Sequence, residues 1–587
     1  MKMPSLLFIL SATLITALET LSPLKVDTTV NLSSITVDRS VVPLPPTVAR
    51  LDTQSCIWTR DGVAILCPFD IIDQGWQIGT IYPDGSNFQC ISCAADIEGS
   101  PGFLYAFPDK KSIFFATASQ SSSPDAVSLP QVVECSPSVL QCERATVRSV
   151  KIPEVDGTLS LREPRITPDG HHLEWTILRT DGFLMLMGEL TRTSESYTVS
   201  NARVLNAAPN PTTSEQWAIR GAFSEGKSFF KGKTLVFAST RGQGGNLDDY
   251  TLDLATGAVT RVTFNSEWDE DGAFDPSGTY ILLGTSRRMH NQLRTVTSMN
   301  LAPFIDGSVF LTLSFASLST TEQRLHILEK WLITPASDAA GLDGVMLNCK
   351  QGGWASGASK NPWNPDGKRA AWGERGQNGT TRLIIATFTG LPSSASLSCE
   401  FPQDDEDCQT PTPLWAPLLV DYPLLEAGQY SIAGPSGGKA ILTTSANVLG
   451  PLHAIDYHGY VQVDGTVVNG RTEMKGLFSS GNQTLTSNVR LSGPHQGNST
   501  WILRVVGRQV CGTAVSTVDG ISLVTHHGQF DPSCGFVRPE MCPDGADADA
   551  TEIGETGCIE LPGACANDTD RTKYMAQSIE GPGENCS

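Results

Sequence analysis

The chain contains 587 residues, and its 62 acidic side chains outnumber the 41 basic ones, which gives a formal charge of −21. This charge repels polyanions, so nucleic acid is not an expected partner. The length suggests several domains, although one closed ring of repeats can absorb several hundred residues. Short runs of β-branched and aromatic residues, bounded by Gly, Pro, Asn and Asp, predict an all-β protein.

The N-terminal segment has the pattern of a signal peptide. Lys2 is followed by an apolar stretch, Leu6 to Leu18, and then by small and polar residues. We expect the signal peptide over residues 1–22 and an N-terminal extension over 23–55. The stretch is too short to cross a bilayer, and no later segment has the roughly 18 apolar residues that a membrane-spanning helix needs. The sequence therefore predicts a secreted, extracellular protein without membrane contact.

Secretion would place the fifteen cysteines in an oxidising compartment, where they favour disulfides over metal ligands. The close pairs are Cys90 with Cys93, Cys135 with Cys142 and Cys399 with Cys408. The spacing of the first pair would also suit a zinc knuckle or a redox pair. Because no second Cys-x-x-Cys accompanies it, we expect no metal and no other cofactor. An odd number of cysteines leaves one without an intrachain partner.

Glycosylation sequons agree with passage through a secretory pathway. Each sequon alone is a weak signal, but N-linked glycans are expected at all of them. The acceptor residues are Asn31, Asn378, Asn482, Asn498 and Asn567.

A repeated unit organises the chain: an aromatic or β-branched strand, a tight turn of Pro-Asp-Gly type, and a second apolar strand. Pro presets the first turn position and Gly takes positive φ, so each copy predicts a hairpin. The copies lie at 58–62, 106–110, 166–170, 221–226, 272–278, 363–367 and, more weakly, 434–439. Second hairpins such as 251–263 lie between the copies. Two hairpins make one four-stranded blade.

Stacking such blades in a ring leaves few open sheet edges, and the seven copies predict a seven-bladed β-propeller over residues 56–445. The repeats resemble the TolB-like, or PD40, propeller class, which specifies fold more than function. Continued alternation predicts a small β-sandwich, or an extension packed on the propeller, at 446–525. Cysteines amid Gly, Asp and Pro predict a disulfide-held tail at 526–587.

Counting back from each turn indicates which side chains face the mouth of the ring, where propeller enzymes place their sites. Five positions before the turn proline or its equivalent stand Glu163, Arg220, Asp271 and Lys360. Glycoside cleavage needs two carboxylates that flank the bond, and arginines suit a uronate carboxylate. The catalytic candidates are Asp269, Glu270, Glu374 and Glu163. The substrate-binding candidates are Arg220, Arg241, Arg287, Arg288, His290, Arg375 and Trp268.

One motif points to a different chemistry. Residues Gly434 to Gly438 match the Gly-x-Ser-x-Gly elbow of α/β-hydrolases. The segment aligns instead with the propeller turns, and no βαβ pattern follows it. We therefore interpret Ser436 as a hairpin residue and not as a nucleophile.

The signal peptide, the PD40-like blades with Ser266 to Gly272 ahead of one turn, and the Cys-bearing β-rich tail together resemble fungal saponin hydrolases. This resemblance implies a secreted glycosidase that cleaves the glucuronide linkage of triterpenoid saponins, with a small-molecule glycoside as substrate. It supplies no catalytic motif. Two other functions stay open: a non-catalytic carbohydrate-binding propeller, and a polysaccharide lyase-like propeller with a histidine-bound metal.

Overall fold

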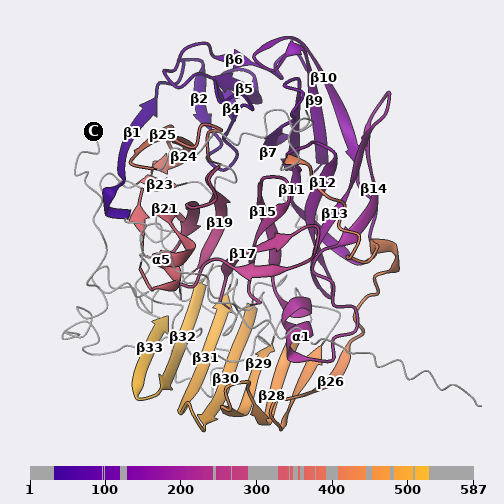
Figure 1. The fold of residues 1–587 in the computed structure, drawn as a ribbon, viewed down its shortest axis with the longest axis vertical. Helices are drawn as coiled ribbons and strands as arrows, with labels where there is room; N and C mark the ends of the chain where they lie inside the picture. The colour runs from indigo at the N-terminus through magenta and orange to yellow at the C-terminus, as the bar shows by residue number, and fades with distance from the viewer. Residues whose placement is uncertain are drawn as a thin grey trace, which may run out of the picture.

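The computed structural model shows a chain built almost entirely of antiparallel strands (Figure 1). It describes residues 32–95, 97, 99–118, 129–241, 246–265, 268–287, 328–342, 344–347, 354–356, 362–376, 378–391, 408–444, 452–475, 482–506 and 509–527. The α-helices in these ranges are α1 (Ser214–Gly221) and α5 (Pro335–Ala339), and the 3-10 helices are η1 (Leu32–Ser34) and η5 (Leu419–Asp421).

Six blades make up the ring that the described strands form. Blade 1 contains β2 (Val48–Leu51), β3 (Ile57–Trp58), β4 (Ile65–Ile71), β5 (Gly75–Ile81) and β6 (Gln89–Cys90). Blade 2 contains β7 (Ser100–Ala106), β8 (Ser112–Ala118), β9 (Leu129–Ser138) and β10 (Gln141–Lys151). Blade 3 contains β11 (Thr158–Ile166), β12 (His172–Arg179), β13 (Gly182–Arg192) and β14 (Tyr197–Val204).

The other three blades repeat the same strand order. Blade 4 contains β15 (Ser224–Phe230), β16 (Thr234–Ser239), β17 (Asp248–Asp253) and β18 (Val259–Arg261). Blade 5 contains β19 (Asp269–Phe274), β20 (Ile281–Thr285), β21 (Glu329–Ile333) and β22 (Val345–Met346). Blade 6 contains β23 (Trp354–Ser356), β24 (Arg369–Gly376), β25 (Thr381–Thr389) and the N-terminal strand β1 (Thr36–Val42).

Strand β1 closes the ring. It pairs antiparallel with β25 from Thr36 opposite Thr389 to Val42 opposite Leu383, so the first described strand completes the last blade. Blade 6 then meets blade 1, where the indole Nε1 of Trp58 donates to the carbonyl of Pro362 at 3.1 Å. Within the part of the chain that the structure describes, the ring is therefore closed by six blades, and the seven that the repeat count predicts are not confirmed.

The turn chemistry inferred from the sequence is confirmed at most copies. Gly170 and Gly278 adopt φ of 75° and 76°, as the Pro-Asp-Gly and Pro-Ser-Gly turns require. The carboxylate of Asp169 accepts the backbone N–H of His171 at 3.0 Å, which ties the turn to the next strand. At 106–110 the left-handed position is taken by Lys110.

The seventh copy belongs to a different structure. Its turn, Gly434 to Gly438, joins β26 and β27, and the backbone N–H of Gly434 donates to the carbonyl of Gly438. Ser436 is thus a hairpin residue, as the sequence predicts.

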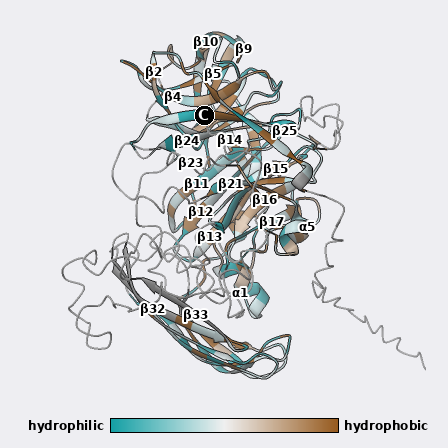
Figure 2. Cartoon of the chain, turned by 90° about the vertical axis from the view of Figure 1, so that its left-hand side faces the viewer, coloured by the Kyte–Doolittle hydropathy of each residue, from teal (hydrophilic) through white to brown (hydrophobic). Residues whose placement is uncertain are grey.

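An eight-stranded antiparallel meander follows the ring. Its strands are β26 (Gly428–Ala433), β27 (Lys439–Thr444), β28 (Leu452–Val461), β29 (Val467–Lys475), β30 (Asn482–Ser492), β31 (Gly497–Val506), β32 (Gln509–Val518) and β33 (Ile521–His527). These strands form one sheet in chain order and not the two packed sheets of the predicted sandwich. Figure 2 shows it as a curved layer at one end of the ring. From residue 528 onward, the expected Cys-rich tail lies outside the described residues.

Helix α1 joins this C-terminal sheet to the ring. Its Trp217 is buried among Ile432, Leu442 and Tyr457 of the sheet. The helix leads directly into β15, the innermost strand of blade 4. The inner strands therefore begin at the end of the ring that faces the sheet (Figure 1).

A buried carboxylate, Asp181, fastens the same junction. Its carboxylate accepts hydrogen bonds from Nε and Nη2 of Arg179 at 2.5 and 2.9 Å and from the guanidinium of Arg220 in α1. It also accepts the backbone N–H of Leu425 at 2.7 Å. Both guanidinium groups also lie over the ring of Tyr422. One side chain therefore ties blade 3, α1 and the connection to the C-terminal sheet.

The disulfides agree with two of the predicted pairs. Cys90 is bonded to Cys93 and Cys135 to Cys142, and a third disulfide joins Cys56 to Cys67. Cys408 is also disulfide-bonded, while Cys399, its predicted partner, lies outside the described residues. Among the described helices, none has the length and apolar character needed to cross a membrane.

Asp181→Asn should loosen the C-terminal sheet from the ring, because two buried guanidinium groups lose their common anion. Leaving a buried ion pair half-complete costs about 3–5 kcal/mol. We expect a lower Tm by calorimetry and faster cleavage by thermolysin, which cuts before leucine and valine, between residues 419 and 428. Asp70→Asn, which removes an exposed pair with Arg50, is the matched control and should change stability by less than about 1 kcal/mol. Equal protease resistance of wild type and Asp181→Asn would contradict the role of Asp181.

Candidate functional site

The inner strands of blades 3 and 5 carry the same β-bulge. In β11 the register shifts between Arg162 and Arg165, and in β19 between Glu270 and Ala273. The first extra residue of each bulge has positive φ, 45° at Glu163 and 61° at Asp271. Such bulges re-aim side chains and are frequent next to active sites. Glu163 and Asp271 therefore occupy equivalent places, as counting from the turns predicts.

The equivalent place in blade 4 differs from the prediction. The hairpin turn of this blade lies between β15 and β16, with Lys231 and Gly232 at positive φ, and not at 221–226. Counting back from Gly232 by the same interval reaches Glu225. Arg220 instead lies in α1 and binds Asp181.

These strands bring several carboxylates around the buried ammonium group of Lys227. Its Nζ donates to Glu225 at 2.7 Å and to Glu163 at 3.1 Å, and it also contacts Glu270. Asp271 lies 3.7 Å away. One carboxylate oxygen from each of the three glutamates lies within 4.8 Å of the others. Three blades thus converge on one cation.

Two arginines and two further carboxyl groups extend this group. Arg162 donates through Nε to Glu225 at 2.6 Å, and Arg165 lies 3.2 Å from Glu163 and 3.4 Å from Glu174. We call the whole set the axial cluster. Its members are Arg162, Glu163, Arg165, Glu174, Glu225, Lys227, Asp249, Glu270 and Asp271.

Glycines on the inner strands make room for the two outer carboxyl groups of the cluster. A Cβ at Gly226 would collide with the carboxylate of Glu174, and one at Gly272 with that of Asp249. Burial raises the pKa of Glu174 to about 7, and it raises the pKa of Asp249 well above its usual range. Burial therefore shifts both groups toward the protonated form relative to exposed carboxyl groups.

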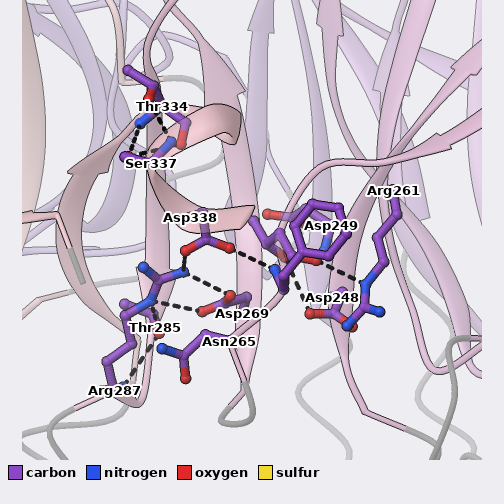
Figure 3. Close-up of polar contacts among 12 residues, drawn as sticks. Asp248, Asp249, Arg261, Asn265, Asp269, Thr285, Arg287, Thr334, Ser337 and Asp338 are labelled. Atoms are coloured by element: carbon purple, nitrogen blue, oxygen red, sulfur yellow. Dashed lines mark hydrogen bonds and ion pairs between the residues drawn. The ribbon is translucent and has the colours of Figure 1, made fainter. Parts of the chain in front are cut away.

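Figure 3 shows a second polar group, which lies next to Asp249 of the axial cluster. Arg287 bridges Asp269 at 2.8 Å and Asp338 at 2.6 Å. Arg261 pairs with Asp248 at 2.6 Å. Burial raises the pKa of Asp248 to about 8 and that of Asp338 to about 6. Asp269, which directly precedes Glu270 of the axial cluster in the sequence, thus forms a buried ion pair with Arg287.

Other predicted site residues are spread over the ring. Trp268 is buried, and its Nε1 donates to Glu270 at 2.8 Å. Glu374 lies in blade 6 between Arg39 and Arg382, at 2.5 and 2.6 Å. Arg375, its neighbour on β24, is exposed.

The remaining candidates are Arg241, Arg288, His290 and Lys360. Arg241 is half-buried at the end of β16, with its guanidinium over the ring of Tyr250. Arg288, His290 and Lys360 lie outside the described residues.

Sequence reasoning missed six members of the axial cluster: Arg162, Arg165, Glu174, Glu225, Lys227 and Asp249. Arg162 directly precedes a predicted rim residue, and its side chain keeps 42 % of its exposure. Glu225 and Lys227 were hidden because the turn of blade 4 has no Pro-Asp-Gly signal. A search for alternating charges ahead of Gly232 could have found them.

Comparison with known proteins gives only distant structural similarity. No family model and no curated protein matches the chain. TolB from Acinetobacter baumannii is 13 % identical, with 59 % of this chain and 65 % of that one covered, at a TM-score of 0.29. An oligogalacturonate lyase in complex with manganese is 11 % identical, with 61 % and 97 % covered, at 0.32.

A puromycin-hydrolyzing peptidase of Mycobacterium tuberculosis is 12 % identical, with 69 % of this chain and 52 % of that one covered, at a TM-score of 0.33. The match thus spans less than two thirds of the length of the TolB protein and about half that of the peptidase. Similarity at this level carries no argument about activity. The strand pairing within this chain defines the propeller.

The raised pKa values predict a protein that is more stable in acid. Glu174, Asp248, Asp249 and Asp338 have pKa values above those of the unfolded chain, near 4. Their contribution is complete below about pH 4 and is lost as pH rises through the raised values. The lowered pKa of His172 makes the folded chain less stable in acid, but this single group opposes the four carboxyl groups named above.

By calorimetry, we expect Tm at pH 5 to exceed Tm at pH 8.5 by roughly 5 °C or more. Asp249→Asn should reduce that difference, because an amide does not titrate. A Tm that rises between pH 5 and pH 8.5 would overturn this expectation.

Glu374→Gln should destabilise the ring closure, because Arg39 of β1 and Arg382 both lose a buried anion. We expect the free energy of unfolding to fall by about 3 kcal/mol in urea titrations. Asp366→Asn, which breaks a half-exposed pair with Arg369, serves as control and should cost at most about 1 kcal/mol. Equal losses in the two variants would show that Glu374 is not structurally special.

Proposed function

We propose that this chain is a secreted glycoside hydrolase that cleaves a glucuronide linkage of triterpenoid saponins or similar glycoconjugates. The reaction would take place at the axial cluster, at the end of the ring that faces the C-terminal sheet. The resemblance to saponin hydrolases suggests the substrate, and the arrangement of carboxylates supports the reaction class.

The observation that carries the proposal is the meeting of Glu163 and Glu270. They come from blades 3 and 5, and oxygens of the two carboxylates lie within 4.8 Å of each other. Their side chains keep 10 % and 9 % of their exposure, whereas those of Glu225 and Asp271 are fully buried. Paired carboxylates at this short separation suit a retaining glycosidase, in which they are about 5–5.5 Å apart.

The contacts of the two glutamates suggest their roles. Glu270 accepts the indole N–H of Trp268 on Oε2 and the ammonium of Lys227 on Oε1, which favours its ionised form and suits a nucleophile. The contacts of Glu163 with Lys227 and Arg165 both fall on Oε2. Both cations favour the ionised form of Glu163 as well. Its proposed role, to protonate the leaving oxygen and later to activate water, therefore requires that it take up a proton when the substrate binds.

Arg162 completes the proposed site. Arg162 donates from Nε and, at 3.4 Å, from Nη2 to the carboxylate of Glu225, and its side chain stays partly exposed. A guanidinium pairs well with the carboxylate of a uronic acid.

A carbohydrate-binding propeller without catalysis is the second candidate. The observation that favours it is the pairing of both glutamates with the same ammonium group. Such pairing holds carboxylates rigid for recognition as readily as for chemistry.

Glu163→Gln and Glu270→Gln distinguish the two candidates. If the chain is a hydrolase, each variant should lower kcat/KM on a soyasaponin-type glucuronide by at least about 100-fold, because one of two essential carboxyls is lost. Released sugar would be measured by chromatography.

Glu189→Gln is the matched control, since Glu189 lies on β13 and bonds only an exposed asparagine among the contacts described. It should keep wild-type activity. A wild-type protein that binds the glycoside without releasing sugar would favour the binding propeller, and absence of both would remove the proposed substrate class.

A further inference from the structure

Lys227 has an unusual environment for a lysine. It lies on β15 at the register shift of blade 4, and its side chain is fully buried. Its ammonium group contacts carboxylates from blades 3, 4 and 5. Lysine is almost never fully buried unless it is paired, and here one ammonium serves several anions.

The side chains around Lys227 carry more negative than positive charge. The axial cluster has three cationic side chains and six carboxyl groups. Protonation of Glu174 and Asp249 would still leave four anions against three cations. Asp249 is completely buried, and neither of its carboxylate oxygens has a hydrogen-bond partner among the described residues, although its charge interacts with Lys227. The cluster therefore carries a net negative charge, which a cation at its centre compensates.

The carboxylates around the ammonium form the ligand set of a hard cation. Oxygens from Glu163, Glu225 and Glu270 lie within 4.8 Å of one another. Carboxylate oxygens converging on one point are what Ca²⁺ and Mn²⁺ prefer. Here the charge at that point is supplied by the protein.

We infer that Lys227 is a built-in substitute for a divalent cation, and that removing its side chain turns the three glutamates into a divalent-metal site. The lysine holds carboxylates from three blades together without an external ion. If the proposed function is correct, Lys227 is a positioning residue for Glu163 and Glu270. The metal site expected in the variant does not depend on the proposed function.

The test compares Lys227→Ala with wild type in metal-free buffer and in 1 mM MnCl₂. Without metal, repulsion among the glutamates should lower the Tm of the variant by roughly 10 °C or more. Mn²⁺ should recover at least half of that loss, while the wild-type Tm should move by less than about 1 °C. Electron paramagnetic resonance should show one bound Mn²⁺ per variant chain and none specifically bound to wild type.

Two controls make the result specific. Lys439→Ala removes an exposed lysine from the C-terminal sheet and should bind no Mn²⁺. Adding Glu225→Gln to Lys227→Ala should weaken Mn²⁺ binding at least tenfold, because one ligand loses its charge. If the variant folds only when refolded with Mn²⁺, the inference is supported.

Failure to fold in both buffers, or a folded variant without bound Mn²⁺, overturns the inference. Activity provides a separate readout: on a glucuronide that wild type hydrolyses, Lys227→Ala should have below about 1 % of wild-type activity and regain at least tenfold with Mn²⁺. A wild type without activity would refute the proposed function and leave the metal-binding result unaffected.

Discussion

Closure of the ring by β1 is the constraint on which the rest of the molecule depends. Each blade is a twisted sheet with an open edge, and a propeller is stable only if the last blade is completed and packs on the first. The hydrogen bonds of β1 to β25 provide that completion, and Glu374 reinforces it by pairing with Arg39 of β1 and Arg382 of β25. Once the ring is closed, the inner strands of blades 3, 4 and 5 must meet at the axis.

The convergence at the axis has an electrostatic cost. Carboxylates that would be hydrated in an open sheet are buried together, and the ring compensates with Lys227, Arg162 and Arg165 and with raised pKa values at Glu174 and Asp249. Burying many charges is weak evidence for stability as such. A cluster maintained at this cost is better explained by a function that needs carboxylates held in fixed positions.

The C-terminal sheet lies at one end of the ring (Figure 2). Trp217 of α1 packs on the sheet, and Asp181 ties the helix and the connecting segment to blade 3. The sheet therefore stands at the end of the ring where the inner strands begin. In the proposed hydrolase, a glycoside would pass this sheet on its way to the axial cluster. The contacts of Asp181 would then affect the access of substrate as well as the stability of the fold.

Local chemistry explains what could be predicted from the sequence alone. Most of the predicted turns and blade hairpins, two disulfides and the place of Ser436 in a hairpin turn depend on neighbours within a few residues. These predictions hold, except for the turn expected at 221–226. The equivalence of Glu163 and Asp271 also followed, because the distance from turn to bulge is the same in both blades.

Only the tertiary structure decided the number of blades, the single C-terminal sheet and the composition of the axial cluster. Residues 434–439 have the turn chemistry of a blade, but β26 pairs with β27 and β27 with β28 of the C-terminal sheet. Lys227 is unremarkable in the sequence, and it becomes central because ring closure brings glutamates from three blades to it. Pairing between distant strands sets these features, and no local pattern encodes which distant edge a strand will meet.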